Sequence, residues 1–134
     1  MSGKLTPAIA EAILESLPLE MTLIDENDRI VWWNTRLPRI FKRSDDILGR
    51  DVRWCHSAES NRTIDRLLRE MKAGERDAAR MWFDRTGADG APQKLLIEYV
   101  AVRDAGGRYL GCIEILQDVA PLRALEGERK TLDD

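Results

Sequence analysis

Three successive runs rich in apolar residues in the second half of the chain most strongly limit its possible folds. The runs cover residues 78–85, 93–103 and 108–119. Two short segments rich in Gly and Asp, residues 86–90 and 104–107, separate them. Strand-length runs joined by such turns are typical of consecutive antiparallel strands. The sequence therefore predicts a three-stranded antiparallel meander.

The first part of the chain predicts a helix followed by a hairpin. Residues 6–17 carry apolar side chains at helical spacing, with Thr6 as a possible N-cap, Pro7 at the first helical position and Pro18 after the helix. Residues 21–34 then change to strand-like runs around the turn residues Glu26 to Asp28. We expect two further strands here, ending at Asn34.

The middle of the chain predicts short helices and one longer helix. We expect a helical turn over residues 37–41 and a second one over residues 45–48, capped by Ser44 and ended by Gly49. A longer helix is predicted from Glu59 to Ala73, with an apolar face and a charged face. Its apolar face consists of Ile64, Leu67, Leu68 and Met71.

This order predicts an α+β domain. Two strands before the helices and three after them would join in one five-stranded antiparallel sheet, with the short helices and the longer helix on one face. Flanking helices would precede and follow the sheet; the second one has a narrow apolar seam of Leu122, Leu125 and Leu132. We expect an N-terminal flanking helix in residues 1–20, a core in residues 21–119 and an exit helix in residues 120–134.

Composition narrows the class of protein. The chain has 134 residues, 43% of them hydrophobic, which fits one globular domain. Its net charge of −3 comes from interleaved positive and negative residues, so no basic face favours nucleic acid. We find no apolar run of about 20 residues and no signal-peptide pattern, so no membrane contact and a cytoplasmic location are expected. Two cysteines and one histidine favour neither a disulfide framework nor a closed zinc site.

Several segments resemble the PAS domain family. They are residues 16–34, 46–52 and 102–111 with 117–119, which include Asn34 and Asp118 at the ends of predicted strands. Asn34 can bind nearby backbone groups, and Asp118 can do the same at the junction of the last strand and the exit helix. Within the family, residues 49–56 and 123–129 resemble the PAS module that follows hemerythrin-like domains in some bacterial and archaeal proteins.

The resemblance implies a PAS fold and a sensory function. A pocket between the sheet and the short helices would hold a small ligand or cofactor, or be packed, and the flanking helices would transmit its state to a signalling protein partner. The apolar seams of both flanks also predict a homodimer. The alternative is a cofactor-free module for dimerisation or protein interaction. No nucleophile, base and oxyanion set can be assembled from these residues, so an enzyme is not expected.

Four residues are candidates for a cofactor site. His56 is the one histidine and could be an axial ligand to haem (heme) iron, or it could be structural. Its neighbour Cys55 could be a thiol activated by the imidazole or a structural cysteine. Trp33 and Trp54 could stack on a flat ligand or pack in the core. The identity of the cofactor remains open, with haem as one possibility.

Two acidic residues in the predicted strands complete the candidates. Glu98 and Glu114 have apolar neighbours on their own faces, so either could meet a polar ligand group inside the pocket. Solvent-facing positions are the expectation favoured for both, because ionised carboxylates are seldom buried.

Overall fold

The computed structural model describes residues 1–35 and 38–132 as an α+β domain built on one antiparallel sheet. The five strands lie in the order β2-β1-β5-β4-β3, so the last strand pairs with the first. Their bounds are β1 Glu20–Asp25, β2 Ile30–Trp33, β3 Ala78–Thr86, β4 Pro92–Arg103 and β5 Tyr109–Asp118. The helices are α1 Pro7–Ser16, η1 Asp45–Ile47, η2 Val52–Cys55, α2 Ala58–Lys72 and α3 Ala120–Arg123. The predicted α+β class and five-stranded sheet are confirmed.

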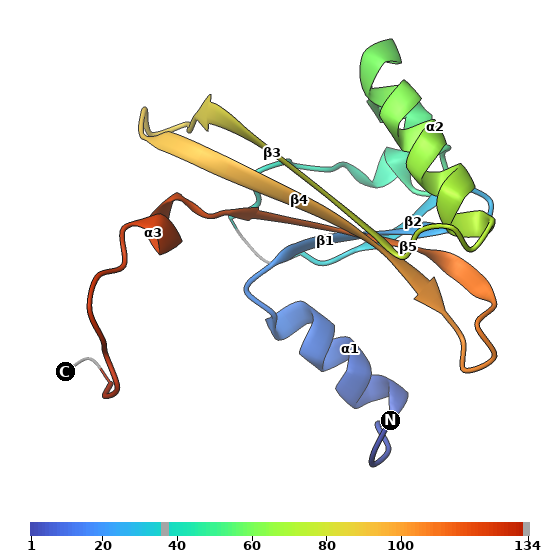
Figure 1. Ribbon diagram of the computed structural model, residues 1–134, viewed down its shortest axis with the longest axis horizontal. Helices are drawn as coiled ribbons and strands as arrows, with labels where there is room; N and C mark the ends of the chain where they lie inside the picture. The colour runs from blue at the N-terminus through green and yellow to red at the C-terminus, as the bar shows by residue number, and fades with distance from the viewer. Residues whose placement is uncertain (36–37, 133–134) are drawn as a thin grey trace.

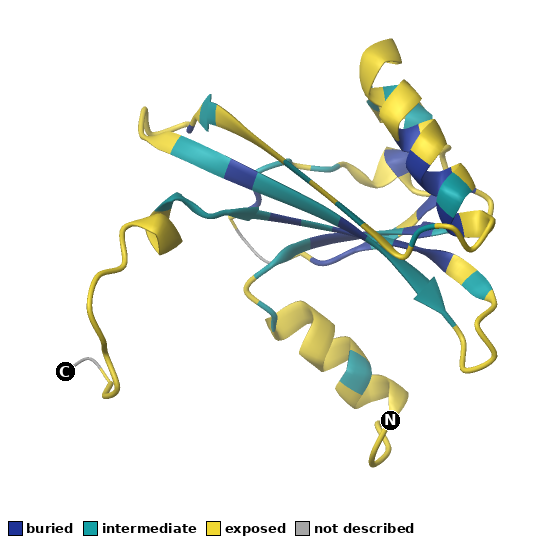
Figure 2. Ribbon diagram, viewed as in Figure 1, coloured by how far each residue is buried: buried dark blue, intermediate teal, exposed yellow. Residues whose placement is uncertain are grey.

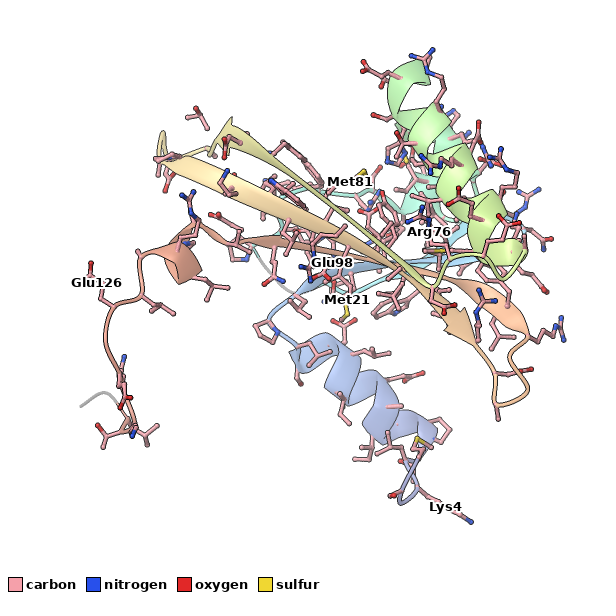
Figure 3. All side chains as sticks on the ribbon, viewed as in Figure 1. Lys4, Met21, Arg76, Met81, Glu98 and Glu126 are labelled. Carbon is pink, nitrogen blue, oxygen red and sulfur yellow. The ribbon has the colours of Figure 1, made fainter. Side chains whose placement is uncertain are left out.

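Helices lie on both sides of the sheet. In Figure 1, α2 lies on one side and α1 on the other, while the C-terminal segment extends away from the sheet. The side chains follow this division: Met21 lies on the side of α1 and Met81 on the side of α2 (Figure 3). The segment between β2 and α2, with η1 and η2, connects the first hairpin to α2. None of the described helices has the length and apolar character to cross a membrane.

The core lies between α2 and one face of the sheet. Figure 2 shows buried residues along the side of α2 that faces the strands. These are Ile64, Leu67, Leu68 and Met71, the four residues that the sequence assigns to its apolar face. They pack with Ile24 and Ile30 of the first hairpin and with Tyr99 and Cys112 of the central strands. Ser57 caps the helix by accepting a hydrogen bond from the Ser60 amide.

Aspartates shape the hairpin turns. The Asp25 carboxylate accepts hydrogen bonds from the amides of Asn27 and Arg29, both at 2.9 Å. Asp104 accepts in the same way from Gly106 and Arg108, again at 2.9 Å. A short carboxylate that binds amides two and four residues ahead replaces the backbone partners that a turn lacks. The predicted turns around 26–28 and 104–107 are therefore confirmed.

One glycine is required by a close contact between strands. Gly111 is the first residue of β5 that pairs with β1, where it lies opposite Asp25, and its φ is 156°. A Cβ atom at this position would lie 2.3 Å from the carbonyl oxygen of Ile24. Any side chain would push β1 and β5 apart, so glycine permits the pairing on which the sheet order depends.

Two predicted helical segments differ from the structure. The exit helix, expected over 120–134, is helical only in α3, and residues 124–132 form no regular element; residues 133 and 134 lie outside the described residues. Leu125 and Leu132 are 75% and 93% exposed. A helix with no surface to pack against is marginal at this length, which explains the early end.

The turn predicted over 37–41 is also not helical in its described part, residues 38–41, and Leu37 lies outside the described residues. Here the amides of Ile40 and Phe41 donate to the Glu20 carboxylate, so they are held by β1. Side-chain acceptors from another element have replaced the carbonyls that a helix would supply.

Replacing Leu68 with alanine should lower the free energy of unfolding by about 2–5 kcal/mol, because its side chain is 1% exposed and its removal leaves a cavity under α2. Urea unfolding followed by circular dichroism would measure the change. Arg69→Ala, at the next and exposed position, is the matched control and should change stability by about 0.5 kcal/mol or less. Equal effects of the two substitutions would contradict the packing described for α2.

Candidate functional site

The main cavity lies between the sheet and the helical side of the domain. Its volume is about 600 Å³, within the range of small-molecule sites. The loop before η1 and the first half of α2 form one wall, and β3, β4 and β5 form the other. Apolar side chains supply much of the lining: Phe41, Ile47, Ile64, Met81, Phe83 and Ile97. This position agrees with the pocket expected between the sheet and the short helices.

A buried polar group lies in the wall of this cavity. Arg43 Nη2 is 3.5 Å from Glu114 Oε1, and their side chains are 11% and 8% exposed. Arg43 Nε also donates to the hydroxyl of Thr22 at 3.1 Å, and the Tyr99 hydroxyl donates to Glu114. Burial, followed by the charge of Glu114, raises the pKa of Tyr99 well above its usual range. The phenol therefore stays protonated and remains a donor at physiological pH.

The backbone that carries Arg43 is held by a second buried group around Asn34. The Asn34 side chain accepts from the Met21 amide at 2.9 Å and donates to the Leu19 carbonyl at 2.7 Å. Arg39 donates to both the backbone and the side-chain oxygen of Asn34, and its Nη2 is 3.8 Å from Glu20. The prediction that Asn34 binds nearby backbone groups is confirmed. Together these bonds fix the loop against β1, so Arg43 enters the cavity from a constrained backbone.

Cys55 and His56 both line the cavity. The His56 ring Nδ1 is 2.8 Å from the Val52 carbonyl, which can only accept, so Nδ1 is the donor in this contact. Cys55 Sγ lies 3.3 Å from the same carbonyl and 3.6 Å from His56 Nδ1. Because Nδ1 is a donor, it cannot take a proton from the thiol. The arrangement gives no support to a thiol activated by this imidazole.

The two tryptophans named as candidates lie away from the cavity lining. Trp33 is 9% exposed and packs in the core between the first hairpin and α2. Trp54 is 57% exposed and stacks under the Arg50 guanidinium, whose central carbon is 4.3 Å from the ring centroid. Trp32 and Trp33 are consecutive residues of β2, paired with Leu23 and Thr22 of β1, so their rings face opposite sides of the sheet.

The second cysteine is deeply buried. Cys112 is fully buried in the core beside Ile24 and Tyr99. Burial, with the nearby charge of Glu114, raises the pKa of its thiol to about 12. It therefore remains a neutral thiol at physiological pH. Among the described residues, no group of three or more His, Cys, Asp or Glu could hold a metal ion.

Glu114 is a site residue that the favoured sequence interpretation placed wrongly. It was expected to face solvent, yet it is 6% exposed and lies in the cavity wall. Glu98 does lie at the partly exposed outer face, where it pairs with Arg80 at 3.1 Å. The available signal was strand alternation: Glu114 shares its face with the buried Cys112 and Leu116. Its partner Arg43 comes from a loop, so no local pattern predicts the pair.

Comparison with known proteins identifies related sequences and folds. A family profile described as "PAS domain" matches residues 10–120. The C-terminal domain of a Streptococcus mutans protein is 30% identical over 94% of both chains, with a TM-score of 0.80. No curated protein matches the chain significantly.

Two further structures share the fold at lower identity. The PAS domain of BvgS from Bordetella pertussis is 18% identical over 87% of this chain and 90% of its own, with a TM-score of 0.63. VqmA of Vibrio cholerae, in a structure bound to DPO, is 19% identical over 84% of this chain and 57% of its own, with a TM-score of 0.60.

Replacing Glu114 with alanine should lower the free energy of unfolding by about 3 kcal/mol, because it leaves the buried Arg43 without its counter-charge and Tyr99 without its acceptor. Chemical denaturation at neutral pH would measure the loss. The control is Glu98→Ala, which removes an ion pair on the outer face and should cost about 1 kcal/mol at most. If Glu114→Ala proved as mild as this control, the buried pair would not be a significant structural contact.

Proposed function

Because the chain belongs to the PAS domain family, we propose that it is a non-catalytic, cytoplasmic sensory domain that binds a small molecule in the cavity beside Arg43 and Glu114. Binding would change the flanking segments, which pass the signal to a protein partner. The cavity, with its apolar lining and its buried polar group, is the observation that carries this proposal. Such a combination of an apolar surface with a few placed polar groups is typical of ligand sites.

The polar group indicates how a ligand would act. The Arg43 and Glu114 atoms are 3.5 Å apart, which is long for a charge-assisted hydrogen bond. A ligand with a polar end could bind either partner while its apolar part contacts Ile97 and the other apolar lining residues. VqmA, which shares this fold, has been solved bound to DPO, and this supports the proposal that the present chain also binds a ligand.

The loop that carries Arg43 connects the cavity to the N-terminal flank. The loop forms hydrogen bonds with Glu20 and Asn34. Thr35, the residue after Asn34, binds α1, because its amide and hydroxyl both donate to Glu15 Oε2, at 3.1 and 3.2 Å. On the C-terminal side, Asp118 accepts from the amides of Lys94 and Ala120 at 3.1 and 3.0 Å. A shift of the loop would therefore reach the N-terminal flank, and a shift of β5 would reach the C-terminal flank.

The alternative function is a cofactor-free module for dimerisation or protein interaction. Its support is the apolar side of α1, where Ile9 and Ile13 are 51% and 43% exposed, so this helix offers a surface for a second copy of the chain. The shortness of α3 limits the contribution of the C-terminal flank. A chain that binds no small molecule but dimerises through α1 would favour this alternative.

A fluorescent apolar anion, 8-anilinonaphthalene-1-sulfonate, can test the cavity. We expect one saturable site per folded chain, and Ile97→Trp should weaken binding strongly because the larger side chain fills the cavity. Val31→Trp, at an exposed position of β2, is the matched control and should leave binding unchanged. Fluorescence titration would measure both, with circular dichroism confirming the fold. Binding that is unaltered in Ile97→Trp would rule out this cavity as the site.

Haem is a candidate for the small molecule, because His56 in the cavity lining could ligate its iron. Metal-binding histidines commonly donate one ring nitrogen to a carbonyl and bind the metal through the other, and the contact between His56 Nδ1 and the Val52 carbonyl would leave Nε2 for such a role. Lys42 and Arg43, which also line the cavity, could pair with carboxylates at the edge of the macrocycle. When bound, the iron would supply a site for small gaseous ligands. Because His56 is the one histidine of the sequence, a single substitution can test whether it binds the iron.

Titration of the purified protein with haemin tests this possibility. If haem is the cofactor, a Soret band should develop to one equivalent, and His56→Ala should abolish or strongly shift it. Cys55→Ala should leave the band unchanged unless the thiolate is the ligand. Failure of the wild-type protein to take up haemin, or an unchanged spectrum in both variants, would reject axial ligation by this segment and leave His56 as a structural residue.

We also propose a closer relationship to PAS modules that follow hemerythrin-like domains. Its support is the pair of segments at residues 49–56 and 123–129. The first segment contains η2 and the cavity residues Cys55 and His56. A sequence comparison that grouped the chain with PAS modules from other domain arrangements would contradict this relationship.

A further inference from the structure

The free edge of the sheet is the starting point for one further inference. β3 is the last strand in the sheet order and pairs only with β4 among the described strands. It is nine residues long, and it exposes Trp82 and Phe83 by 64% and 42%. A long edge strand with exposed apolar residues is a template for pairing with another strand. The question is which strand its residues fit.

Hydrogen bonds next to the strand show which backbone groups face outward. The Ala101 amide donates to the Asp77 carbonyl, and the Gly87 amide donates to the Ala91 carbonyl. In an antiparallel ladder such pairs recur at every second residue, so the odd-numbered residues of β3 direct their backbone groups to β4. The even-numbered residues Arg80, Trp82 and Asp84 direct theirs to the free edge.

The outward contact of Ala78 agrees with this alternation and limits the free edge. Its carbonyl accepts from Arg76 Nη1 at 3.4 Å rather than from β4. Within the described chain, no backbone hydrogen bond from another segment is recorded at Arg80, Trp82 or Asp84 on that side. The open part of the edge therefore begins after Ala78.

The side chains of these three residues form a self-complementary row. Arg80 and Asp84 flank Trp82 symmetrically and lie on the outer face, where they pair with Glu98 and Lys94 of the neighbouring strand. The Arg80 and Asp84 side chains are 62% and 76% exposed, so both remain open to a second partner. We propose that β3 pairs antiparallel with β3 of a second copy of this chain, centred on Trp82.

This register is selected by charge. Pairing about Trp82 places Arg80 of each copy opposite Asp84 of the other and brings the two Trp82 side chains together. Shifting the centre to Met81 or Phe83 places Trp82 opposite Arg80 or Asp84 instead. Opposite charges directly across an antiparallel pair stabilise it, and like charges destabilise it. The contact is isologous and lies at the β3 edge, so it differs from a dimer formed through α1.

Complementary charge variants test the register. In Asp84→Arg each copy would set arginine opposite arginine, and in Arg80→Asp each would set aspartate opposite aspartate. Each variant alone should associate about tenfold more weakly than the parent, whereas an equimolar mixture should recover the parent's association because every cross-strand pair is then of opposite charge. Sedimentation velocity of a fluorescently labelled variant, with and without the unlabelled other variant, measures this recovery.

Matched controls separate this effect from net charge and from other contacts. Arg108→Asp and Glu126→Arg make the same charge changes at exposed positions away from β3 and should leave association as in the parent. Circular dichroism would confirm that all variants are folded. A mixture that sediments no faster than its separate components, single variants that associate as the parent does, or a parent that is monomeric at several hundred micromolar would overturn the proposal. A dimer insensitive to residues 80 and 84 would instead indicate contact through α1.

Discussion

The buried amide of Asn34 is the interaction on which much of the remaining structure depends. It joins the end of β2 to the backbone on both sides of the start of β1, and it also accepts from Arg39. A side chain with both a donor and an acceptor can satisfy two backbone groups of opposite kind, which neither aspartate nor leucine could do. The bond to Arg39 extends this fixed point into the loop. The position of the cavity wall thus depends on one amide that does not itself line the cavity.

The cavity combines two requirements that normally oppose each other. An apolar interior stabilises the domain, while a buried ion pair such as Arg43 and Glu114 adds little stability over a well-packed apolar pair, although removal of one partner alone is costly. The pair is nevertheless well supplied with neutral partners, since Thr22 and Tyr99 bind its two members. A polar group so surrounded can exchange one partner for a ligand atom without leaving the others unsatisfied. This arrangement suits a site that must be stable both empty and filled.

Local patterns predicted the elements of the fold better than they predicted the site. The α2 face, the hairpin turns and the meander follow from periodicity and turn residues, which depend on neighbours in the sequence. Strand alternation places Glu114 on the buried face, but a buried carboxylate is plausible only with a partner of opposite charge. That partner, Arg43, lies in a loop distant in sequence. The exit helix failed for a related reason: Leu125 and Leu132 have helical spacing but no surface to cover. The burial of Glu114 and the early end of the exit helix both depend on the presence or absence of tertiary contacts.

The pairing of β5 with β1 also affects the order in which the domain can be built. β1 and β2 are synthesised early, but β1 lies between β2 and β5, and β5 is the last strand of the sheet to leave the ribosome. During synthesis the edge of β1 that later pairs with β5 therefore stays unpaired until nearly the whole domain has left the ribosome. Contacts of such long sequence separation slow folding, and the waiting edge is vulnerable to aggregation. The close contact of Gly111 with Ile24 therefore forms late, when β5 of the C-terminal meander pairs with β1 of the N-terminal hairpin.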